Sequence, residues 1–293
     1  MYKPGATTPR IGPAPAVDTA VPPGTGRVVL LYLGLFLADA LLSTLAGIAG
    51  EPITQGLDRP LWSPRGAAAS ALSDLVVFGG LLALLAVWVI LCEHRPLTAL
   101  GLGTPQRGRE FTSGCLLGLV IAVGALIVTA ARGWTAMRVS VPASTLIAFA
   151  PLWMTMSTFQ AGVEEIIFRG WMLPLLARRW HISAAVLIQA VLFSCLHLLV
   201  SANTTLAVIH SLAFGVFAGL YTLHRSGIWG VIGIHGAYNF ATILVISVSA
   251  DGQYGAFAWH YTAIALTGVG ATVMLILFRR RPSSAPDKFE GPP

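Results

Sequence analysis

Eight apolar runs, each close to the length needed to cross a bilayer, dominate this chain and restrict the folds open to it. They lie near residues 28–49, 68–92, 112–131, 144–168, 183–199, 203–223, 227–249 and 256–278. Because a lipid interior offers backbone N–H and C=O groups no partners, runs of about 20 apolar residues cross it as helices. The sequence therefore predicts an all-α, polytopic integral membrane protein with about eight transmembrane helices.

The composition supports this fold class and argues against nucleic acid as a partner. Only 10% of the residues are charged and 55% are hydrophobic, whereas about a quarter of the residues of a soluble domain are charged. The net charge of +6 comes from basic residues that border the apolar runs. We therefore predict contact with a lipid bilayer and no binding of nucleic acid.

Polar segments at both ends delimit the membrane domain. Residues 1–26 are rich in Pro, Gly, Ala and Thr, and residues 279–293 have a similar polar, Pro-containing character. Both are predicted to be flexible tails, because they cannot bury enough apolar surface to fold. Residues 27–278 are predicted to form one membrane domain, in which no internal repeat is evident.

The basic residues are divided unequally between alternate loops. With eight spans, thirteen of the 18 Lys and Arg residues fall on the side that holds both ends and four fall on the other, while Arg169 lies in or beside a span. Loops rich in Lys and Arg stay in the cytosol. We therefore predict a multi-pass protein of the cell membrane with both termini cytosolic, and reporter fusions to the two ends would check this orientation.

Ionisable side chains within the apolar runs are the most informative positions. Burying each of them costs a few kcal/mol, so they tend to be paired and functional. Asp39 and Asp74 are single acids in the first two runs, and His210 is a single imidazole in the sixth. For these three residues a structural role in helix pairing is the preferred interpretation, and a functional role stays open.

The stretch GVEEIIFRG, residues 162–170, contains two adjacent glutamates and an arginine. Glu165 and Arg169 are four residues apart and share a helical face, which predicts an ion pair. Glu164 is turned by about 100° from Glu165 and shares its face with Gln160, so it can face a cavity. A purely structural ion cluster at a helix end is the alternative.

Two later stretches place further polar residues one helical turn apart. FSCLH carries Phe193 and His197 on the fifth run, and HGAYN carries His235 and Asn239 on the seventh. With a rise of about 1.5 Å per residue, both histidines lie at depths comparable with that of Glu164. We predict that the two histidines and this glutamate converge in one polar cavity.

The three stretches together resemble the motifs of the CPBP intramembrane endopeptidases, also called the CAAX-protease or Abi family. These motifs are EExxxR, FxxxH and HxxxN or HxxxD on successive membrane helices, and the match covers about residues 145–245. The resemblance implies an intramembrane endopeptidase. Its substrate would be a membrane-associated protein or peptide, of which it hydrolyses a peptide bond.

The resemblance also implies roles for individual residues. The catalytic residues would be Glu164, His197, His235 and Asn239, and the supporting residues Glu165, Arg169 and Phe193. Glu164 and His197 would activate the attacking water, while His235 and Asn239 would stabilise the oxyanion. In a metalloendopeptidase, a divalent metal such as zinc would be bound by Glu164, His197 and His235, since catalytic zinc takes about three protein ligands. A metal-free glutamate mechanism is the alternative.

Two other function classes remain open on the sequence alone. One is a non-catalytic membrane scaffold, immunity or regulatory protein, against which the intact set of Glu, His, His and Asn argues. The other is a proton-coupled transporter that uses the same polar residues as a relay, against which the lack of internal repeats argues.

Overall fold

The structure, a computed structural model, describes residues 25–55, 60–133, 141–197, 204–225, 227–248 and 252–279. Within these ranges the regular structure is helical throughout and no strand occurs. The α-helices are α1 (Thr25–Thr54), α2 (Pro64–Val87), α3 (Arg107–Ala131), α4 (Ala143–Glu165), α5 (Leu173–Ala177), α6 (Ile182–Leu196), α7 (Thr204–His224), α8 (Trp229–Val248) and α9 (Gly252–Arg279). The predicted all-α fold class is confirmed, and the predicted tails lie outside the described residues apart from their innermost ends.

Each predicted apolar run coincides with a helix of the structure. Among the described residues, five helices are long and apolar enough to cross a membrane, namely Val28–Thr54, Pro64–Cys92, Arg107–Ala131, Ala143–Ala177 and Thr205–His224. The apolar parts of α6, α8 and α9 are shorter. The polytopic membrane architecture is thus confirmed, whereas the cytosolic placement of the ends stays a prediction.

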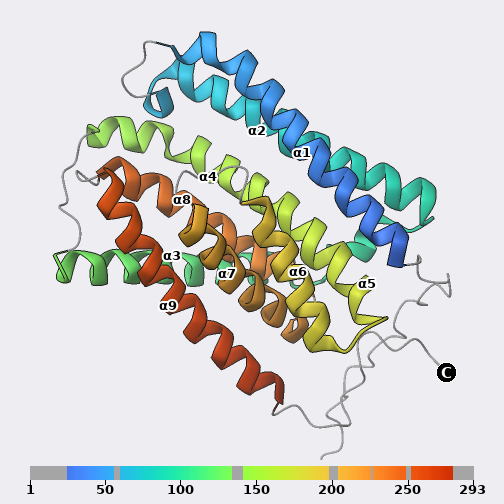
Figure 1. Cartoon of the computed structure of the whole chain (residues 1–293). Helices are drawn as coiled ribbons and strands as arrows, with labels where there is room; N and C mark the ends of the chain where they lie inside the picture. Colours follow the sequence, from blue (N-terminus) through green and yellow to red (C-terminus); the bar gives the residue numbers. More distant parts are fainter. Residues whose placement is uncertain are drawn as a thin grey trace, which may run out of the picture.

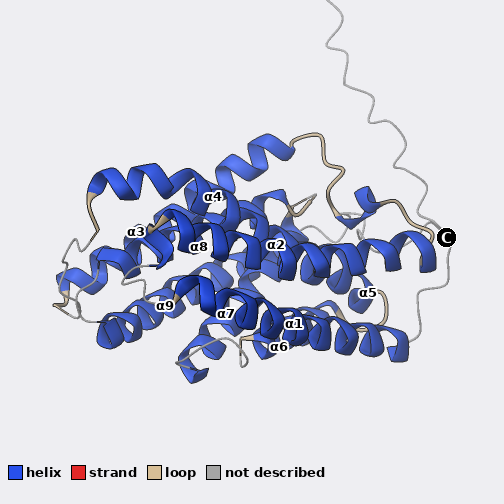
Figure 2. Ribbon diagram, turned by 90° about the horizontal axis from the view of Figure 1, so that it is seen from above, coloured by secondary structure: helices blue, strands red, loops and turns tan. Residues whose placement is uncertain are grey.

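The helices form one bundle in which α8 has a central place (Figures 1 and 2). It packs between α3 and α4, while α6 packs on α7 and α7 on α9. Figure 1 shows α1 and α2 side by side as a pair next to α4. Large apolar side chains such as Leu30 and Leu37 are exposed on the outer surface of α1, which is the pattern of a surface that faces lipid.

The fourth membrane helix passes Gly170 and Pro174 without a break. After α4 the chain forms a π-helical segment, η4 (Ile166–Met172), which leads directly into α5. Leu173 donates its N–H to the carbonyl of Phe168, five residues back, and Pro174, which has no N–H to donate, comes next. All seven residues of η4 are buried, so the irregular turn lies inside the bundle.

Glycines allow α3 and α8 to pack with their backbones in contact. Gly114 and Gly118, one turn apart on α3, face the backbones of Gly230 and Ile234 on α8 so closely that a Cβ atom would collide with the two carbonyl oxygens. Small residues four apart are the usual means of such close helix crossings in membranes. This contact fixes the position of α8, which carries His235.

Gly118→Ala is therefore expected to destabilise the protein, by about 1–3 kcal/mol as overpacked sites generally do. Its melting temperature in detergent should fall below that of Gly124→Ala. Gly124 lies on the same helix, but a Cβ there would make an ordinary contact of 3.6 Å with Leu266, and alanine favours a helix more than glycine does. Equal melting temperatures for the two variants would contradict the close crossing.

Candidate active site

The two adjacent glutamates end α4, directly before η4, and both are buried. Gln160 donates a hydrogen bond from Nε2 to Oε1 of Glu164 at 3.3 Å. Arg169 pairs with Glu165 through NH1 and Oε1 at 3.0 Å, and both side chains of this pair are fully buried. The structure thus contains the ion pair between Glu165 and Arg169 that the helical spacing predicted. The bond from Gln160 to Glu164 joins two residues that were predicted only to share a face.

Aromatic rings enclose the buried guanidinium. The central carbon of Arg169 lies 4.4 Å from the ring centroid of Phe193 and 5.6 Å from that of Phe214. A cation over a ring face is attracted by the ring quadrupole, but a buried cation still requires a countercharge. Glu165 supplies this countercharge in the ion pair.

His235, on α8, contacts both glutamates with its two ring nitrogens. Its Nδ1 lies 2.8 Å from Oε1 of Glu165, and its Nε2 lies 3.7 Å from Oε2 of Glu164. Since the carboxylate paired with Arg169 can only accept, Nδ1 carries the proton and donates it. Sequence reasoning missed this bond, because it assigned Glu165 to the arginine alone.

His197 follows directly on the last residue of α6. Its Nδ1 lies 3.2 Å from the carbonyl oxygen of Phe193, and a carbonyl only accepts, so Nδ1 donates here too and Nε2 is the acceptor nitrogen. The Phe193 ring centroid lies 5.0 Å from the ring of His197 and 6.0 Å from that of His235. This phenylalanine therefore packs against both imidazoles.

A cavity of about 180 Å³ opens between α6, α7 and α8. Its lining residues are Phe193, His197, Ala207, His210, Ser211, Phe214, His235, Tyr238, Asn239 and Thr242. His197, His235 and Asn239 thus line the same cavity, as expected if they belong to one site. Glu164 is not among the lining residues and approaches the cavity through its neighbour His235.

Two residues have surroundings that the sequence did not predict. His210, interpreted as a helix-pairing residue, lines the cavity with its ring 5.4 Å from that of Tyr238. Tyr238 also lines the cavity. Its place in the HGAYN stretch, between His235 and Asn239, could have indicated this from the sequence. Asp39, on α1, is close enough to Glu164 for their charges to interact.

The predicted metal ligands are Glu164, His197 and His235. The Nε2 atoms of His197 and His235 are both acceptors when the rings are neutral, as metal binding requires. However, no group of three or more His, Cys, Asp or Glu side chains in the described part of the chain is placed to hold a metal ion. The side chains as arranged do not fit a three-ligand zinc site with Glu164, and the divalent metal stays a prediction.

The fold and these contacts define a polytopic membrane protein with a buried carboxylate and imidazole site of the kind that can activate water. Residues 146–241 match the family model described as Rce1-like, type II CAAX prenyl endopeptidase. This match spans both glutamates, both histidines and Asn239, and it supports the resemblance to the CPBP/CAAX-protease family that the three motifs predicted. No curated protein and no solved structure matches the chain significantly.

Proposed function

We propose that this protein is an intramembrane endopeptidase that hydrolyses a peptide bond of a membrane-associated protein or peptide with a water molecule activated by Glu164. The observation that carries the proposal is the position of Oε2 of Glu164. This atom is buried, accepts no hydrogen bond and lies 3.7 Å from Nε2 of His235 beside the cavity. The family match of residues 146–241 supports the same reaction class.

The spacing of these two atoms suits a bridging water. At 3.7 Å they are too far apart for a direct hydrogen bond, but one oxygen at about 2.8 Å from each can bond to both. Glu164 takes a proton from this water as its oxygen forms a bond to the substrate carbonyl carbon. His197 presents Nε2 to the same cavity and orients the water as a second acceptor.

The negative charge that develops on the carbonyl oxygen needs donors. Asn239 lies one turn after His235 on the same cavity wall and offers its side-chain amide N–H. The bond from Nδ1–H of His235 to Glu165 holds this imidazole beside the same position. Such fixed donors act strongly where water is scarce. When the C–N bond breaks, Glu164 passes its proton to the leaving amine.

Cleavage of a peptide library by the purified full-length protein in detergent tests this proposal. We expect wild-type protein to cleave and to keep its activity with a chelator, because Glu164 activates the water without a metal. Loss of activity with the chelator and its recovery with zinc would contradict the metal-free mechanism and support a metalloendopeptidase. Absence of cleavage for both library peptides and membrane-protein substrates would favour the non-catalytic scaffold instead.

A further inference from the structure

A further carboxylate, Glu93, lies at the end of the second membrane helix and has no part in the chemistry above. Its Oε1 accepts hydrogen bonds from the indole nitrogens of Trp88 at 2.9 Å and Trp171 at 2.8 Å. Its Oε2 accepts from NH1 of Arg95 at 3.0 Å. Three donors therefore converge on one side chain that is 7% exposed.

The two tryptophans come from different parts of the chain. Trp88 belongs to the π-helical segment η2 (Trp88–Cys92), which directly precedes Glu93. Trp171 belongs to η4, 78 residues further along the chain. Hydrogen bonds to a carboxylate are among the stronger ones in proteins. Of these two bonds, the one from Trp171 ties the second membrane helix to the segment that follows the catalytic glutamate.

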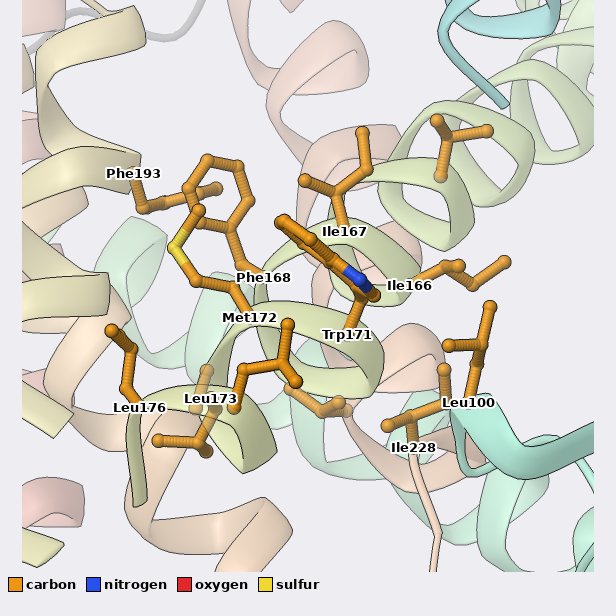
Figure 3. Packing of buried hydrophobic residues seen from close by; sticks show 14 of the residues in the cluster. Leu100, Ile166, Ile167, Phe168, Trp171, Met172, Leu173, Leu176, Phe193 and Ile228 are labelled. Carbon is orange, nitrogen blue, oxygen red and sulfur yellow. The ribbon is translucent and has the colours of Figure 1, made fainter. Parts of the chain in front are cut away.

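Within η4, the contacts that hold the segment point in different directions. Figure 3 shows Phe168 and Met172 on the side of Phe193, and the Trp171 indole, with its nitrogen in blue, turned away from that ring. The Phe168 and Phe193 ring centroids are 5.2 Å apart. Gly170 lies against the turn at Leu100, where a Cβ atom would come within 2.5 Å of the carbonyl oxygen. The segment η4 is thus held on several sides.

The register of η4 matters because a π turn contains one more residue than an α turn. If η4 returned to α-helical bonding, the residues after it would rotate by about one residue, or 100°, relative to α4. Arg169 lies within η4. A change in the path of this segment would therefore also disturb its pair with Glu165, to which His235 is bonded. A fixed Trp171 opposes the rotation, since its indole cannot turn without leaving Glu93.

We propose that Glu93 is a positioning residue for the active site, which clamps Trp171 and thereby holds η4 in its π-helical register. The clamp keeps Arg169 on Glu165 and, through Glu165, keeps His235 oriented toward Glu164. The catalytic part of this inference rests on the proposed endopeptidase function. The structural part, a link from the second membrane helix to η4, does not.

Trp171→Phe and Trp88→Phe form a matched pair for the test. Each removes one indole hydrogen bond to the same oxygen of Glu93, but only Trp171→Phe cuts the link to η4. In the peptide assay, Trp171→Phe should lower kcat by about tenfold or more with KM unchanged, since a misplacement of about 1 Å can cost up to 10²-fold. Trp88→Phe should keep kcat within about twofold of wild type.

Conservative replacement of the carboxylate separates the clamp from general stability. Glu93→Gln retains an oxygen that accepts from both indoles, whereas Glu93→Ala removes it. We expect Glu93→Gln to keep kcat near the wild-type value and Glu93→Ala to lower it as Trp171→Phe does. Equal kcat losses in Trp171→Phe and Trp88→Phe would overturn the positioning role.

Hydrogen exchange of the full-length protein in detergent tests the clamp without any assay of activity. Amides of Ile166–Met172 should exchange faster in Trp171→Phe than in Trp88→Phe, because only the first variant releases η4. Equal exchange in the two variants would overturn the clamp even if the enzyme is active. If wild-type protein cleaves nothing, the proposed endopeptidase function is contradicted, and with it the effect of the clamp on catalysis. The exchange result alone then decides whether Glu93 holds η4.

Discussion

Glu164→Gln should abolish peptide cleavage and leave the protein folded. The amide has the size of the carboxylate and can still accept a hydrogen bond from Gln160, whose Nε2 lies 3.3 Å from Oε1. It cannot take a proton from water, and a general base contributes about 10²–10⁴-fold to the rate. We therefore expect kcat/KM to fall by at least about 10²-fold with little change in melting temperature.

Glu110→Gln is the matched control for this experiment. Glu110 lies on α3, is buried to a similar extent and also has an Oε2 that accepts no hydrogen bond. It is not among the residues that contact the glutamate pair or line the cavity. This control should retain cleavage. Full activity in Glu164→Gln would end the mechanism as assigned.

Arg169→Ala should destabilise the protein severely, by about 3–5 kcal/mol, the usual cost of breaking a buried ion pair from one side. The reason is that Glu165 is fully buried and its charge would lose its nearest cation. Melting temperature and folded yield in detergent measure this effect. A variant that melts like wild type would show that the pair has no structural role.

Glu165→Gln should lower both the stability and the activity of the protein. The reason is that this carboxylate holds both Arg169 and Nδ1 of His235. The double variant Glu165→Gln with Arg169→Met removes both charges, and it should recover part of the stability that either single change loses. Its activity should stay low, since His235 lacks its charged partner. Recovery of stability and activity together would contradict a role of Glu165 in orienting the histidine.

Much of the fold was predictable because the governing forces are local in the sequence. A lipid interior forces each long apolar run into a helix whatever its neighbours are, and all eight runs coincide with helices. The ion pair between Glu165 and Arg169 was predictable for the same reason, since a spacing of four residues brings side chains together within one helix. The uninterrupted passage through Gly170 and Pro174 was not predicted, because it depends on a π turn held by its surroundings.

The contacts between helices were decided by the tertiary structure alone. The bond from His235 to Glu165 depends on how close α8 comes to α4, and that distance follows from packing such as the crossing at Gly114 and Gly118. The same holds for His210 on the cavity wall and for the hydrogen bond from Trp171 to Glu93. Helical periodicity determines which residues share a face of one helix. Which faces meet depends on the close fit of side chains from segments far apart in the chain.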